Sequence, residues 1–139
     1  MSKKVLKLVH QEAVVKVWGA AGTSETIALA DLIATGQVVS GTPTANVVGV
    51  TWTGANETVI TVTRGAERVF TLPSTGSSTI DLSGQALPPD TVENTADLVV
   101  AITGGVGEVW IKLRKIEGYA TTVETEQFGP YDNPLVAGA

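Results

Sequence analysis

Side chains that could perform catalysis or hold a metal are scarce in this sequence. His10 is the only histidine and cysteine is absent, which excludes disulfides, thiolate zinc sites and cysteine nucleophiles. A zinc site would therefore need mostly carboxylates, which is uncommon. No Gly-x-Ser-x-Gly motif marks a nucleophilic serine. Because a lone histidine at the end of an expected strand is more often structural than catalytic, we expect neither a catalytic residue nor a metal site.

The glycine-rich and acidic stretches lack the order that ligand binding requires. Gly104-Gly105-Val106-Gly107 does not end in the Gly-Lys-Ser/Thr of a phosphate-binding loop, so we expect a hairpin turn there. Asp90, Glu93 and Asp97 are irregularly spaced and lack the glycine and final glutamate of an EF-hand. We predict a protein that binds no cofactor and is not an enzyme. A calcium site in a surface loop and a carboxylate pair for glycoside hydrolysis remain open as alternatives.

Charge is distributed unevenly along the chain. The 139 residues carry a net charge of −5, with a pI near 4.7, so we expect no binding to nucleic acid, which requires a basic surface. Basic residues gather in residues 1–16 and in the cluster Lys112, Arg114 and Lys115, whereas residues 116–139 contain acids and no bases. These ends could pair within a subunit, pair between neighbours, or both remain solvated. We see no signal-peptide core and no apolar run long enough to span a bilayer, so we expect no membrane association.

The pattern of valine, threonine and glycine predicts an all-β fold. β-Branched residues favour strands, and short alternating runs broken by Gly, Pro, Asn and Ser are typical of sandwiches and barrels. We expect Gly41 and Pro43 to end one weak strand, and a helical turn around residues 31–34. The prediction is an antiparallel β-sandwich, or a partly closed barrel, of about eight short strands. Ten ranges are candidate strands, of which 26–30 and 37–40 are the weaker ones: residues 5–10, 13–18, 26–30, 37–40, 46–53, 58–63, 68–72, 79–82, 97–103 and 108–115.

The last of these strands presents two different faces. Val109, Ile111 and Leu113 alternate on the side expected to face the core. The opposite side carries a tryptophan among charges: Glu108, Trp110, Lys112 and Arg114. Either the stems of the charged side chains cover Trp110, or this face is a contact surface for a partner.

We predict that residues 1–118 form a single β domain, which includes the basic N-terminal strand. Residues 119–139 are predicted to be an extended acidic arm, because two prolines and two glycines discourage a compact element. This arm holds Tyr119, Phe128 and Tyr131, and disordered tails are normally poor in aromatic residues. We therefore expect the arm to pack against its own domain or a neighbouring subunit.

Several stretches spread over most of the chain resemble small virion structural proteins of tailed bacteriophages, especially those of marine bacteria and cyanobacteria. They are Val5-Leu-Lys-Leu, Glu12-Ala-Val-Val-Lys-Val, Val48-Gly-Val-Thr-Trp-Thr-Gly, Trp110-Ile-Lys-Leu-Arg-Lys and Gly118-Tyr-Ala-Thr-Thr-Val-Glu-Thr. None is a catalytic motif, and the family supplies no functional residues to carry over. The resemblance implies a capsid decoration or cement protein, assembled in the host cytoplasm and present in many copies on the virion.

The expected partners are the major capsid protein or another virion protein, and further copies of this chain, with a trimer as one arrangement. The candidate interaction residues are Trp110, Lys112, Arg114, Tyr119, Phe128 and Tyr131. One alternative is a protein associated with the tail, baseplate or fibre. Another is a carbohydrate-binding or adhesion module that uses Trp18, Trp52 and Trp110 as a sugar platform, although tryptophan is highly buried on average.

Overall fold

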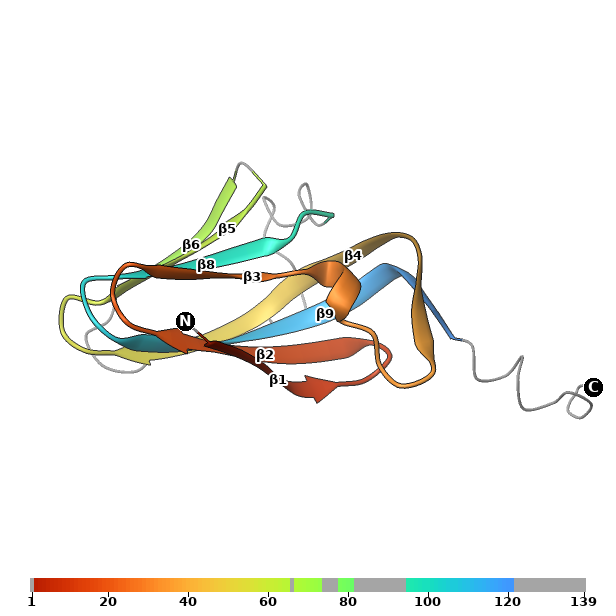
Figure 1. The fold of residues 1–139 in the computed structure, drawn as a ribbon, viewed down its shortest axis with the longest axis horizontal. Coiled ribbons are helices and arrows are strands. Elements are labelled where there is room, and N and C mark those ends of the chain that lie inside the picture. Colours follow the sequence, from red (N-terminus) through yellow and green to blue (C-terminus); the bar gives the residue numbers. More distant parts are fainter. Residues whose placement is uncertain (1, 66, 74–77, 82–94, 122–139) are drawn as a thin grey trace, which may run out of the picture.

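The computed structural model describes residues 2–65, 67–73, 78–81 and 95–121, which form two antiparallel β-sheets packed face to face (Figure 1). One sheet has five strands in the order β1-β2-β9-β4-β7, and the other has four in the order β3-β8-β5-β6. The predicted β-sandwich is confirmed, and the described strands close no barrel. The elements are β1 (Ser2–Leu8), β2 (Glu12–Gly19), β3 (Thr23–Ile27), the 3₁₀ turn η1 (Leu29–Asp31), β4 (Gln37–Gly54), β5 (Val59–Arg64), β6 (Glu67–Pro73), β7 (Ser78–Asp81), β8 (Leu98–Thr103) and β9 (Gly107–Thr121).

The strand order is that of a jelly roll. Four antiparallel pairs are nested along the chain, namely β2 with β9, β3 with β8, β4 with β7, and β5 with β6. Two further pairs, β4 with β9 and β5 with β8, join these hairpins into two sheets. A chain that folds as one long hairpin and then rolls up produces this eight-stranded arrangement, and β1 adds a strand at one edge. The connections between β2 and β3, β4 and β5, and β8 and β9 consequently lie together at one end, here called the loop end (Figure 1).

Side chains that alternate along the strands fill the space between the sheets. Val109, Ile111 and Leu113 are at most 1% exposed, which confirms the core face predicted for the last strand. The neighbouring strand β2 contributes Ala13, Val15 and Val17, and the opposite sheet contributes Ile60, Val62, Val100 and Ile102. Burying one such aliphatic side chain contributes about 1.5–3 kcal/mol, so this inner layer is the main source of stability.

Strand β4 is continuous across the position where a break was predicted. Val39 pairs with Tyr119 and the next pair is Thr44 with Glu117, so residues 40–43 bulge outward opposite Gly118. Gly118 has φ of +85°, and a Cβ atom there would overlap backbone atoms of the bulge. The prediction was wrong because Gly41 and Pro43 occupy a bulge, where a missing ladder donor is tolerated, and do not end the strand.

Strand β9 continues to Thr121, beyond the predicted domain boundary at residue 118. Tyr119 therefore lies within a strand, packs against the core, and donates a hydrogen bond from its hydroxyl to the carbonyl oxygen of Leu29 at 2.7 Å. Residues 122–139, the remainder of the predicted arm, lie outside the described residues. In the described part of the chain, no helix has the length and apolar character needed to cross a bilayer.

Candidate interaction surface

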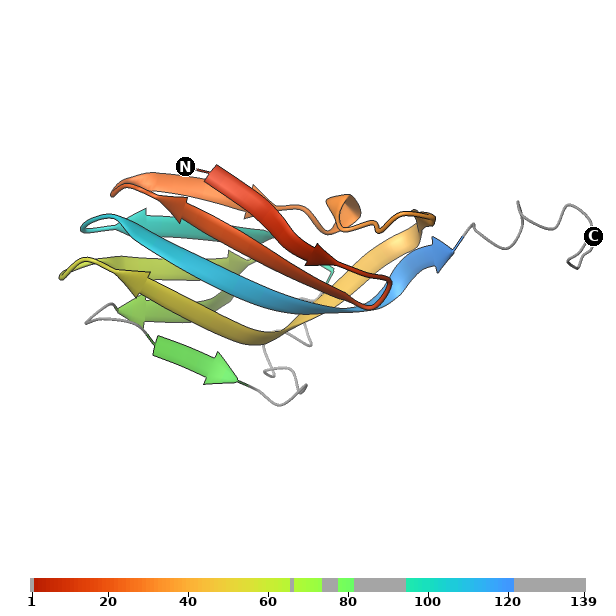
Figure 2. The same ribbon diagram turned by 90° about the horizontal axis from the view of Figure 1, so that it is seen from below.

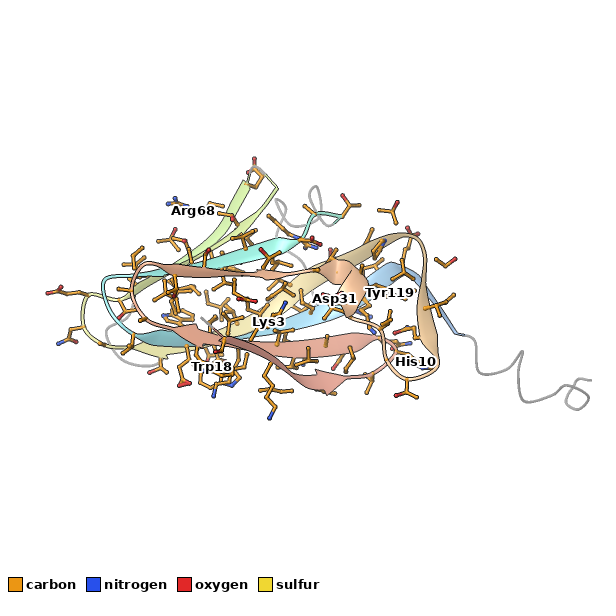
Figure 3. The ribbon with its side chains drawn as sticks, in the orientation of Figure 1. Lys3, His10, Trp18, Asp31, Arg68 and Tyr119 are labelled. Carbon is orange, nitrogen blue, oxygen red and sulfur yellow. The ribbon has the colours of Figure 1, made fainter. Side chains whose placement is uncertain are left out.

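Figure 2 shows the ribbon of the five-stranded sheet. Its outer face gathers aromatic and basic side chains. Val14, Lys16 and Trp18 alternate outward along β2, while the inward residues between them are fully buried. The register places Lys16 opposite Trp110 of β9, and Trp18 opposite Glu108. Trp18 lies on the outside of this sheet in Figure 3.

Lys16 is held between the two tryptophans. Its Nζ atom lies 5.1 Å from the ring centroid of Trp18 and 5.4 Å from that of Trp110. The same Nζ atom is 3.3 Å from Oε1 of Glu108. Each cation–π contact at an exposed site contributes about 0.5–1 kcal/mol, so this arrangement fixes the orientation of both half-buried indoles.

This outer face is hollowed in two places beside the tryptophans. The loop-end hollow, of about 380 Å³, is mostly apolar and is lined by Trp18, Gly19, Thr53, Gly54, Ala55, Val106, Gly107 and Glu108. The central hollow, of about 290 Å³, is lined by Val14, Gly49, Val50, Thr51, Thr79, Ile80, Trp110 and Lys112. Gly49 pairs with Lys112 and has no side chain to fill the surface at that point. The two hollows are therefore concave, mostly apolar recesses next to the two indole rings.

The outer face is basic although the chain is acidic overall. Among the side chains that the structure describes on β1, β2 and β9, five of the nine Lys and Arg residues project on this side, against the acids Glu12 and Glu108; they are Lys4, Lys7, Lys16, Lys112 and Arg114. Glu12 accepts a hydrogen bond from Lys7 Nζ at 3.0 Å, and this bond and the lysine charge lower the pKa of Glu12. Positive charge therefore exceeds negative charge here, which favours an acidic partner surface.

A third, more polar hollow of about 550 Å³ lies at the end opposite the loop end. The described residues that line it include no acid; they are His10, Gln11, Gln37, Arg114, Lys115, Ile116 and Tyr119. His10 is exposed, and its Nε2 atom lies 3.4 Å from the carbonyl oxygen of Thr35. His10 and Tyr119 mark this end of the sandwich in Figure 3. We call it the polar hollow.

Lys115 is the buried cation of the polar hollow. Only 7% of Lys115 is exposed, and its Nζ atom donates to the Leu32 carbonyl at 2.8 Å and to Oε1 of Gln37 at 2.6 Å. The Nζ atom also lies 4.9 Å from the ring centroid of Tyr119. Burial lowers the pKa of Lys115 and raises the pKa of Tyr119 to about 12, because removal from water disfavours the charged form of each group.

The structure brings some of the predicted interaction residues together and separates others. Trp110, Lys112 and Arg114 lie on the basic outer face, and the cation over Trp110 is Lys16 of the neighbouring strand. Tyr119 instead points inward and bonds the chain at η1. Phe128 and Tyr131 lie outside the described residues.

Sequence reasoning missed the contribution of β2 to this face. Lys16 and Trp18 alternate outward in the same way as the residues of β9, but their pairing with that strand depends on the tertiary register. The proposal of Trp52 as part of a sugar platform was wrong, because Trp52 is 7% exposed and its indole N–H donates to the Pro73 carbonyl at 3.1 Å. Among the residues that the structure describes, no group of three His, Cys, Asp or Glu side chains could hold a metal ion.

Comparison with known proteins adds no assignment, since no family model, curated protein or solved structure matches the chain.

Proposed function

We propose that this chain is a non-enzymatic structural protein of a virion, most specifically a capsid decoration or cement protein of a tailed bacteriophage. The observation that carries the proposal is the outer face of the five-stranded sheet, which is aromatic, hollowed and basic on an otherwise acidic chain. Jelly rolls serve as capsid domains and as lectins, so the architecture suits an adhesive role without specifying one.

The geometry of this face supports strong contact from a small area. Tryptophan and arginine are enriched at the energetic centres of interfaces, and Trp110 lies beside the central hollow with Arg114 farther along the same strand. Because Lys16 already fixes the indoles, binding would cost little side-chain entropy. Many weakly bound copies on one shell would then act together.

A rebinding experiment tests the proposal. Particles that lack the gene for this chain are mixed with the purified full-length protein, and bound copies are counted by gel densitometry and located by cryo-EM. Truncating a central interface tryptophan costs about 2 kcal/mol or more, so Trp110→Ala should weaken binding roughly thirtyfold. The matched control is Arg68→Glu, because Arg68 is exposed on the four-stranded sheet.

Particles that never bind the protein would refute the virion assignment. Equal binding by the Trp110 and Arg68 variants would refute the role of the outer face. Cryo-EM density at the tail, baseplate or fibre would show that the protein binds there and not on the shell.

Glycan binding is a second candidate, favoured by one observation. Trp110 borders the central hollow, where the hydroxyl oxygens of Thr51 and Thr79 lie 3.1 Å apart, so an aromatic ring and hydroxyl groups line one recess. A glycan array probed with the full-length protein tests this idea. Binding that is lost in Trp110→Ala and retained in Arg68→Glu would support a lectin, and a blank array would remove it.

A further inference from the structure

The polar hollow contains a cation that has no ion-pair partner within the described part of the chain. Lys115 is 7% exposed, and its contacts are a carbonyl oxygen, an amide oxygen and an aromatic ring. Arg114 and His10 line the same hollow, and the lining residues that the structure describes include no carboxylate. A buried charge is best stabilised by an opposite charge, so the hollow is chemically suited to a carboxylate.

The chain itself supplies carboxylates from the rim of this hollow. Thr121, the last residue of β9, pairs with Gln37, which lines the hollow. Residues 122–139 follow directly and contain three acids and no Lys or Arg. This segment also contains Phe128 and Tyr131. Ile116 lines the hollow, Val38 and Val39 follow Gln37 in β4, and all three side chains are exposed. The polar hollow and the segment 122–139 are therefore complementary in charge, and both carry apolar side chains.

A contact within one subunit would require the chain to reverse its direction after Thr121, because Lys115 precedes Thr121 on β9. The backbone of Lys115 lies six residues before Thr121 along this strand, which corresponds to roughly 20 Å. The sequence between Thr121 and Gly129 contains no Gly, Pro, Asn or Asp, the residues that a reversal normally uses.

We propose that Glu124 and Glu126 of a second copy of this chain dock in the polar hollow, where they pair with Lys115 and Arg114. The hollow lies at the end of the sandwich where β9 ends at Thr121, so the exchange can be reciprocal. Reciprocal exchange closes an assembly around a symmetry axis, whereas a donor and an acceptor at opposite ends would build an open fibre. The inference concerns self-association in solution and does not rest on the virion assignment.

Intermolecular paramagnetic relaxation tests this exchange with the full-length chain. Because the protein has no cysteine, Gln127→Cys carries a nitroxide at a single position. Spin-labelled protein of natural isotopic abundance is mixed with ¹⁵N-labelled wild-type protein, so that only contact between copies broadens the observed amide signals. We expect broadening at Gln11, Gln37 and residues 114–119, and none there when the label is instead at Ala21→Cys on the loop end.

Charge-neutral variants then test the chemistry of the contact. In the spin-labelled copy, Glu124→Gln with Glu126→Gln should weaken the association about tenfold or more, while Glu67→Gln on the far sheet should leave it unchanged. Circular dichroism of each variant checks that the fold is unchanged. The inference fails if no broadening passes between copies, or if the neutral variant broadens the same signals equally. Because no particle is present, such a failure would leave the proposed function standing, and a failure to bind particles would leave this exchange standing.

Discussion

Replacing Gly118 with alanine should destabilise the sandwich strongly, because two separate costs meet at this residue. Its φ of +85° lies in the left-handed region, which costs an L-residue about 1–2 kcal/mol. The added Cβ atom would also overlap backbone atoms of Thr42 and Pro43 in the β4 bulge. Forcing packed atoms apart costs about 1–3 kcal/mol, so we expect Gly118→Ala to lower the free energy of unfolding by about 2–5 kcal/mol.

Gly41 provides a matched control in the same bulge. Its φ is +82°, but a Cβ atom there would meet no atom within 4 Å. Gly41→Ala therefore carries only the backbone cost, and both variants gain the same reduction in unfolded-chain entropy. Urea denaturation followed by tryptophan fluorescence should show Gly118→Ala to be less stable than Gly41→Ala by about 1–3 kcal/mol, with equal m-values. Equal losses in the two variants would mean that the bulge does not pack on residue 118, and the account of β4 would be wrong.

Three further predictions concern buried polar groups. Tyr119→Phe should cost about 1 kcal/mol at neutral pH through the lost hydrogen bond. Because the pKa of Tyr119 is raised from 10 to about 12, the wild type should also lose stability as pH rises from 10 to 12. Urea titration at several pH values should show a smaller loss in Tyr119→Phe. The control variant Tyr131→Phe should show the full loss. Lys115→Met should lower the free energy of unfolding by about 1–3 kcal/mol at pH 7, since two buried acceptors lose their donor, and a stability equal to wild type would contradict this role. Because the pKa of Lys115 is lowered in the folded state, the free energy of unfolding of the wild type should rise as pH rises toward 10.5. Lys115→Met should lack this rise. Trp52→Phe should destabilise by about 1–3 kcal/mol through an unpaired buried carbonyl and a lost ring, whereas Trp18→Phe at the surface should change thermal stability little.

Local patterns predicted the strands well wherever alternation was regular. The two faces of β9 follow from side chains that point alternately to opposite sides of a strand, and the structure confirms this division. The expected break at Gly41 and Pro43 was wrong because those residues are compatible with both a turn and a bulge. Only the facing residue, Gly118, makes the bulge possible.

The sequence predicted only the part of the candidate surface that lies on β9. Trp110, Lys112 and Arg114 were identified as one face of one strand, since that is a local property. Their neighbours Lys16 and Trp18 lie more than ninety residues earlier in the chain, and only strand order brings them together. Sequence spacing likewise does not indicate that Lys115 reaches Leu32 across the sandwich.

The sequence by itself determined the all-β class, the inner and outer sides of the regular strands, and the scarcity of groups for catalysis, because these depend on residue type and period-two alternation. Tertiary structure alone decided the jelly-roll order, the contact of Lys16 with two tryptophans and the polar hollow around Lys115. Each of these depends on which distant strands pair and in which register, and a shift of one residue in a strand would exchange its buried and exposed faces.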